Sequence, residues 1–209
     1  MDDRILAMCE LSNDLIFHKI PPDRMSFYVD SSLNAGRTVA RQFVGVGIQK
    51  LYHDNNITVT YSRSGRSGYG VILRGQVTMS PKECSVEVYS ESIKDLAQHS
   101  MTDDVVLTYE DALNVHLAHE FFHFWEYQNG QSIVETLDPI TTFSFLGFQR
   151  KAHIIRCGEI AAHAFAKTLL DLPNLPNLYD YRYLINTGRM ESSHFDQLCT
   201  DMAALLNGS

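Results

Sequence analysis

Residues 117–123 read Leu-Ala-His-Glu-Phe-Phe-His, and the expected fold is built outward from this stretch. Residues four apart in a helix lie on the same face, one turn above the other. His119 and His123 can therefore both reach one zinc ion, at about 2.0–2.1 Å. Glu120 projects from the edge of that face, where it can take a proton from a water on the ion. The pattern thus predicts two metal ligands and a general base.

The helix that carries this motif is expected to begin at Thr108, which can cap it together with Asp111, and to end before Gly130. It would be apolar on the side opposite the motif, as in a buried helix that lines a cleft. The apolar positions are Leu113, Leu117, Phe121 and Phe124.

An alternative is that His119 and His123 are core histidines bonded to the backbone. Two imidazoles and a carboxylate buried without partners would cost several kcal/mol, whereas one metal ion satisfies all three groups. His116 and Glu126 flank the motif on the same face. Each could either orient a ligand or stay solvated or salt-bridged.

A catalytic zinc site usually has a third protein ligand, and Glu159 is the expected one. It lies on a second long helix, expected over residues 148–171 and ending ahead of Pro173. The alternative partner of Glu159 is Arg156, one turn back. His163 could replace Glu159 as ligand or orient a ligand. Apolar residues, several of them small, share the expected Glu159 face, namely Ala152, Ile155, Ala162, Ala166 and Leu170.

The remaining pattern predicts a single α+β domain over 1–209, with a small, mostly antiparallel sheet packed against the motif helix and a mainly helical C-terminal half. Helices are expected over 1–20, closed by Pro21-Pro22, over 32–52 and over 193–206. Strands are expected over 57–61, 71–79 and 84–89. The regions are N-terminal helices at 1–52, a sheet at 57–95, zinc-binding helices at 105–173 and a tail at 174–209. The stretch 62–70 lacks the Walker lysine and is expected to be a loop.

Composition narrows the class of protein. There are 25 acidic and 17 basic residues, with no long Lys/Arg cluster, so a nucleic-acid partner is not expected. No run approaches the roughly 20 apolar residues of a membrane span, so no membrane partner is expected. The four cysteines form no CxxC pair, which favours reduced thiols and a cytoplasmic setting. The sequence sets no oligomeric state.

Two runs of the sequence belong together. They are His119-Glu120-x-x-His123, then Glu159-x-x-Ala162-His163-x-Phe165-Ala166 followed by Leu169-Leu170-Asp171-Leu172-Pro173. The two runs resemble the ImmA/IrrE-type metallopeptidases, which are compact gluzincins. The resemblance covers about residues 105–173, and Phe122 and His163 differ from the usual family pattern. It implies zinc bound by His119, His123 and Glu159 in a zincin-like cytoplasmic enzyme that clips a specific protein, often a transcriptional repressor.

The function expected from these residues is a zinc-dependent peptidase acting on a protein or peptide substrate, with Glu120 as general base. An oxyanion donor would complete the site, and the candidates are His194 and the tyrosines at 179–183, among them Tyr181. The sequence does not choose between them. Two alternatives are a non-catalytic module whose two helices are held together by the metal, and a metal-free helical interaction protein.

Overall fold

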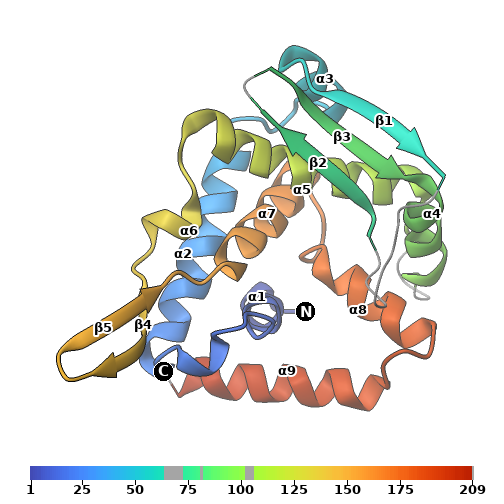
Figure 1. The fold of residues 1–209 in the computed structure, drawn as a ribbon. Helices are drawn as coiled ribbons and strands as arrows, with labels where there is room; N and C mark the ends of the chain where they lie inside the picture. Colours follow the sequence, from blue (N-terminus) through green and yellow to red (C-terminus); the bar gives the residue numbers. More distant parts are fainter. Residues whose placement is uncertain (64–72, 81, 102–105, 209) are drawn as a thin grey trace.

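The computed structural model describes residues 1–63, 73–80, 82–101 and 106–208. Within these residues the chain has an α+β fold that is mostly helical, with a three-stranded and a two-stranded sheet (Figure 1). The helices are α1 (Asp3–Leu11), α2 (Pro22–Ala40), α3 (Ile48–Asp54), α4 (Ser90–His99), α5 (Tyr109–Asn129), α6 (Ile133–Thr136), α7 (Arg156–Leu169), α8 (Asn177–Asn186) and α9 (Ser192–Asn207), with a 3-10 turn at Phe17–Lys19. The strands are β1 (Thr58–Ser62), β2 (Gly75–Met79), β3 (Cys84–Tyr89), β4 (Ile140–Phe145) and β5 (Phe148–Ala152).

Helix α5 has the ends that the sequence predicted. The Thr108 hydroxyl accepts a hydrogen bond from the Asp111 backbone N–H, and the Asp111 carboxylate accepts one from the Thr108 N–H, which is a complete capping box. At the other end Gly130 adopts a left-handed conformation with φ 58°, which terminates the helix. The last helix, α9, also lies within one residue of its predicted bounds.

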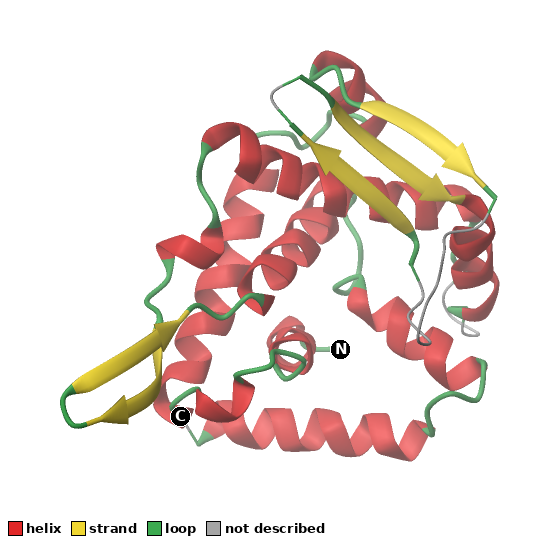
Figure 2. Ribbon diagram, in the orientation of Figure 1, coloured by secondary structure: helices red, strands yellow, loops and turns green. Residues whose placement is uncertain are grey.

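The three-stranded sheet packs on α5 and has the order β1-β3-β2 (Figure 2). Strand β3 is antiparallel to β2 and parallel to β1, so the predicted mostly antiparallel sheet holds only for the β2–β3 pair. The Ser80 N–H donates a hydrogen bond to the Glu83 carbonyl oxygen between β2 and β3. Strands β1 and β2 follow each other in sequence, but β3 lies between them in the sheet. Val86 and Val88 of this central strand are buried. Most of the glycine-rich stretch predicted as a loop lies outside the described residues.

The predicted N-terminal helices are wrong in their bounds. The first helix ends at Leu11, and Pro22 begins α2 instead of closing the preceding helix. Proline is favoured in the first turn of a helix because its missing N–H would be unpaired there anyway. The chain then breaks at Gly45, with φ 85°, before α3 begins at Ile48.

The predicted helix over 148–171 is also wrong in its first third. Strands β4 and β5 form a hairpin whose turn residues Leu146 and Gly147 have φ 44° and 84°, as in a two-residue turn with left-handed residues. Helix α7 begins only at Arg156. Ala152 and Ile155 therefore do not share a helical face with Glu159, and the Ile155 side chain is exposed.

Helix α7 is the central element of the core, because it packs against α2 on one side and α5 on the other. A Cβ at Gly36 of α2 would lie 2.0 Å from the Ala161 carbonyl oxygen, so only glycine allows this close approach. Ala161, Ala162 and Ala166 of α7 are fully buried. In the described part of the chain, every helix is too short or too polar to cross a membrane.

Candidate metal centre

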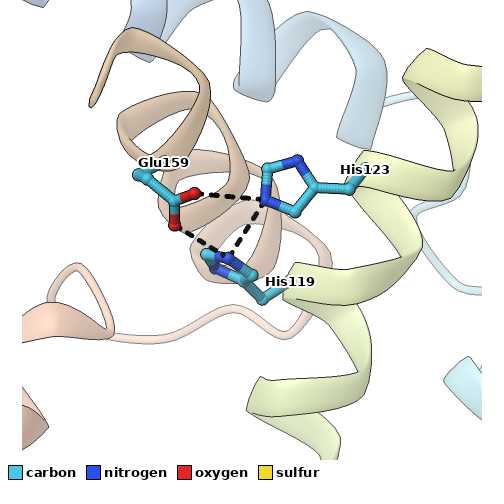
Figure 3. Close-up of side chains that lie close together, drawn as sticks. All are labelled: His119, His123 and Glu159. Carbon is cyan, nitrogen blue, oxygen red and sulfur yellow. Dashed lines mark hydrogen bonds and ion pairs between the residues drawn. The ribbon is translucent and has the colours of Figure 1, made fainter. Parts of the chain in front are cut away.

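The two histidines of α5 and one glutamate of α7 point toward a common centre (Figure 3). His119 Nε2 lies 3.2 Å from His123 Nε2 and 3.2 Å from Glu159 Oε2. His123 Nε2 lies 3.8 Å from Glu159 Oε1. Ligand atoms at the corners of a tetrahedral zinc site lie about 3.3 Å apart. These three side chains are therefore spaced as ligands of one ion.

The chemistry of the three donors also fits a cation. Two imidazole nitrogens lie 3.2 Å apart with a carboxylate beside them, and all three groups can donate a lone pair to one ion when the imidazoles are neutral. In the described part of the chain, this is the group of His, Cys, Asp and Glu side chains able to hold a metal ion. The alternative pairing of Glu159 with Arg156 is not what the structure contains, because the Arg156 guanidinium donates to Glu10 at 2.9 Å.

The carboxylate of Glu159 changes the pKa values of the side chains around it. Burial works against a charge on His119, but the hydrogen bond and charge of the Glu159 carboxylate outweigh it and raise the pKa of His119 to about 9. Burial likewise disfavours the charged form of Glu159, but His119 and the neighbouring imidazoles hold the pKa of that carboxyl well below its usual range. The site thus stabilises one positive charge between these side chains.

Glu126, one of the two residues that flank the motif, contacts His123. Its Oε2 lies 3.2 Å from His123 Nδ1, and its Oε1 accepts a hydrogen bond from the Ile133 N–H at 2.7 Å. A carboxylate at Nδ1 favours the tautomer with the proton on that nitrogen, which leaves the Nε2 lone pair for a metal. This position would let Glu126 orient His123 as a candidate ligand.

His116 has a different environment. Its Nδ1 lies 3.7 Å from Glu120 Oε1, too far for a hydrogen bond, and its Nε2 is buried without a partner. The ring lies against Gly75 of β2, where a Cβ would come within 2.3 Å of that Nε2. Burial lowers the pKa of His116 to about 4, so the ring is neutral at pH 7.

A cleft of about 490 Å³ opens beside the three donors. His119, Glu120 and Glu159 all line it. The side chain of Glu120 is mostly buried, and Glu120 is not one of the three close donors. Glu120 therefore lines the cleft as a carboxylate separate from the three donors.

His163 lies next to the centre without belonging to the close group. Its ring centroid is 5.0 Å from that of His119, and its Nδ1 is buried without a partner. Burial and the nearby His119 lower the pKa of His163 to about 3, so the ring is neutral. Among the described residues the close group therefore has three members, His119, His123 and Glu159.

The proposed oxyanion donors lie in different environments in the structure. His194 is exposed near the start of α9, and the Tyr181 hydroxyl points to the Cys9 carbonyl oxygen at 3.5 Å while its ring stacks on Phe195. Neither is among the described residues that line the cleft, whereas Tyr179 is.

Three charged residues of the cleft, Glu10, Arg74 and Asp180, were not found from the sequence, and Arg156 was considered only as a partner of Glu159. Arg74 donates to Asp180 at 3.2 Å through its Nε, and Arg156 donates to Glu10. They come from α1, the segment before β2, α7 and α8, and no local motif links positions so far apart. Their proximity follows from packing alone.

No protein-family model, curated protein or solved structure matches this chain. The interpretation of the centre therefore depends on the residues and distances given above.

Proposed function

We propose that this protein is a zinc-dependent peptidase in which His119, His123 and Glu159 hold the ion and Glu120 is the general base. One observation carries the proposal: three donor atoms from two helices lie 3.2–3.8 Å apart, and two of the donor residues, His119 and Glu159, line a cleft that is also lined by Glu120. A structural zinc site needs a fourth protein ligand and no base. The arrangement described here has three close donors and a separate carboxylate, Glu120, in the lining of the cleft.

Zinc at this position would supply Lewis-acid activation of a water and of a peptide carbonyl. The protein's own contribution is to hold and move the proton. Glu120 takes the proton from the attacking water and delivers it to the leaving amine. General acid–base catalysis of this kind raises a reaction rate by about 10²–10⁴-fold. Glu126 keeps His123 in the tautomer that binds a metal, through its contact at Nδ1.

The substrate class that fits is a polypeptide. An open cleft of about 490 Å³ with charged and aromatic walls accommodates several residues of an extended chain. The resemblance to ImmA/IrrE-type metallopeptidases supports a zincin-like arrangement of α5 and the sheet, and site-specific cleavage of a regulatory protein. The four free thiols fit a reducing, cytoplasmic compartment.

The test compares wild-type protein with Glu120→Gln and, as a matched control on the same helix, Glu110→Gln, whose side chain is exposed. Zinc content is measured by elemental analysis, and cleavage is followed by mass spectrometry on a mixture of proteome-derived peptides. All three proteins are expected to bind one zinc ion. Glu120→Gln is expected to lose at least about 100-fold in cleavage rate.

Three results would reject the proposal in different ways. Wild-type protein that binds no zinc at neutral pH removes the metal site. A Glu120→Gln variant that cleaves as fast as wild type removes Glu120 from its role. If His163→Ala lowers zinc affinity as much as His123→Ala does, His163 is a fourth ligand and the non-catalytic, metal-stabilised module is the better interpretation.

A further inference from the structure

A second groove, of about 540 Å³, runs between the loop after α1 and the segment that leads from β5 into α7. Leu15 and Ile16 line it from the loop, and Ala152 and Ile155 line it from the other segment. We propose that this groove, called here the aliphatic groove, binds apolar side chains of the polypeptide substrate on one side of the cleaved bond. The inference rests on the proposed peptidase function and adds its specificity.

The aliphatic groove adjoins the cleft beside the proposed metal ligands. Arg156 and Glu159 line both, so the two hollows meet at a proposed metal ligand. In Figure 1 the β4–β5 hairpin projects from the body of the molecule, and the chain passes from it directly into α7. A polypeptide whose scissile bond lies in the metal cleft can therefore extend along the aliphatic groove without leaving the surface.

The walls of the aliphatic groove have the chemistry of a site for apolar side chains. Leu15 is 90% exposed and Ile155 is 69% exposed, although both are large aliphatic residues. They lie on the two opposite walls, so one inserted side chain can remove both from water. Burial of apolar area is the main favourable contribution to such contacts.

The two walls are fixed relative to each other before any substrate binds. One oxygen of the Asp14 carboxylate accepts a hydrogen bond from the backbone N–H of Arg156, and the other accepts one from the N–H of Ile16, both at 3.0 Å. The Arg156 guanidinium in turn donates to Glu10 of α1. A groove held in its bound shape avoids the ordering cost that a loose loop would add to binding.

The position of Glu159 identifies the occupant as a polypeptide in preference to a lipid chain. Glu159 lines both hollows and is a proposed ligand of the ion at which the peptide bond would be cleaved. The exposed Asn13 side chain also lines the aliphatic groove, and its amide can pair with the N–H and C=O groups of a peptide backbone, which an acyl chain lacks.

The experiment profiles the cleavage sites of zinc-loaded protein on the same peptide mixture. Leu15→Gln and Ile155→Gln change the two walls, and Val44→Gln is the control, because Val44 is also an exposed aliphatic residue and lies on neither groove. The wild-type profile is expected to show a preference for apolar residues at positions on one side of the bond. Each wall variant is expected to weaken that preference by about tenfold or more, and the control to leave it unchanged.

Binding gives a second readout that does not require turnover. A fluorescent peptide with a preferred cleavage sequence is titrated with zinc-loaded Glu120→Gln, and its binding is compared with that of the same peptide carrying serine at the apolar position. The apolar peptide is expected to bind about tenfold tighter. That difference is expected to vanish when Leu15→Gln is added.

The outcomes separate the two proposals. Peptide cleavage with no apolar preference, or with a preference that both wall variants retain, overturns the aliphatic groove while the peptidase stands. Wild-type protein that cleaves no peptide overturns the peptidase proposal and this inference with it. Thermal melting and zinc content equal to wild type show that the wall variants are folded, as expected for side chains this exposed.

Discussion

Replacing Glu126 with glutamine tests the metal centre through a residue that does not touch the metal. In the structure one carboxylate oxygen faces His123 Nδ1 at 3.2 Å and the other accepts from the Ile133 N–H at 2.7 Å. Both partners need an acceptor. Glutamine has the same shape but only one acceptor oxygen, so either orientation of its amide turns an NH₂ group toward one of them.

The size of the expected loss in zinc affinity depends on which orientation the glutamine amide adopts. If the amide oxygen keeps the Ile133 bond, the NH₂ faces His123 Nδ1 and favours the tautomer with the proton on Nε2, the atom that must bind the ion. Because the Glu126 side chain is only 12% exposed, water does little to restore the lost acceptor. Loss of such an outer partner weakens metal binding by about 10–100-fold, or about 1.4–2.7 kcal/mol.

The assay is a competition titration of zinc between the protein and a chromophoric chelator at neutral pH. Glu110→Gln, on an exposed part of the same helix, is the matched control and is expected to bind like wild type. Thermal melting of the metal-free proteins shows whether the variant is folded. If folded Glu126→Gln binds zinc as tightly as wild type, then Glu126 does not orient a metal ligand and the role given to it here is wrong.

Two further predictions concern stability. In metal-free protein the pKa of His119, about 9, lies above its unfolded value of about 6.5, so the contribution of His119 to folding stability is complete below about pH 6.5 and is lost as pH rises toward 9. Urea midpoints of the wild type and of a His119→Gln variant, measured across this pH range, test the prediction. Parallel pH profiles of the two proteins would contradict it. Gly36→Ala is expected to destabilise the fold by about 1–3 kcal/mol or more because of the contact with the Ala161 backbone. Gly158→Ala, which would meet only a Val134 side chain at 3.3 Å, is the control, and equal urea midpoints for the two variants would refute the close-approach argument.

The sequence predicted α5 well because its signals are local. A capping residue, a partner three positions later and a terminal glycine each act within one turn of the helix, and they appear in the structure at the expected positions. The spacing of His119 and His123 likewise depends only on helical geometry. The proximity of Glu159 to both rings was a longer inference from an acidic residue among small apolar neighbours on a second helix.

The hairpin before α7 was missed although its signal is present. Phe143, Phe145 and Phe148 surround Leu146-Gly147, and alternation around a glycine-containing pair is typical of a two-residue hairpin. The apolar stripe that continues through α7 predicted a helix over the same residues as the hairpin. The exposed aromatic residues of the hairpin have no helical periodicity and no place in the core.

The sheet order and the charged lining of the cleft could not be predicted because they depend on distant contacts. Placing β3 between β1 and β2 depends on how the chain crosses from Ser62 to Gly75, a connection that no turn motif specifies. Glu10 meets Arg156 across 146 positions of sequence. Such a pair is fixed by the packing of α1 against α7, which side-chain volumes determine and local patterns do not.

The balance of charge in the cleft gives an independent reason for a cation at the three donors. Four carboxylates line it in the described part of the chain, and two arginines face them. Arg74 is paired with Asp180 and Arg156 with Glu10, so the guanidinium groups are already used. Glu120 and Glu159 are left with imidazoles as their neighbours. Since partly buried carboxylates require compensation, a divalent ion held by Glu159 and the two imidazoles would balance the charge that the arginines leave over.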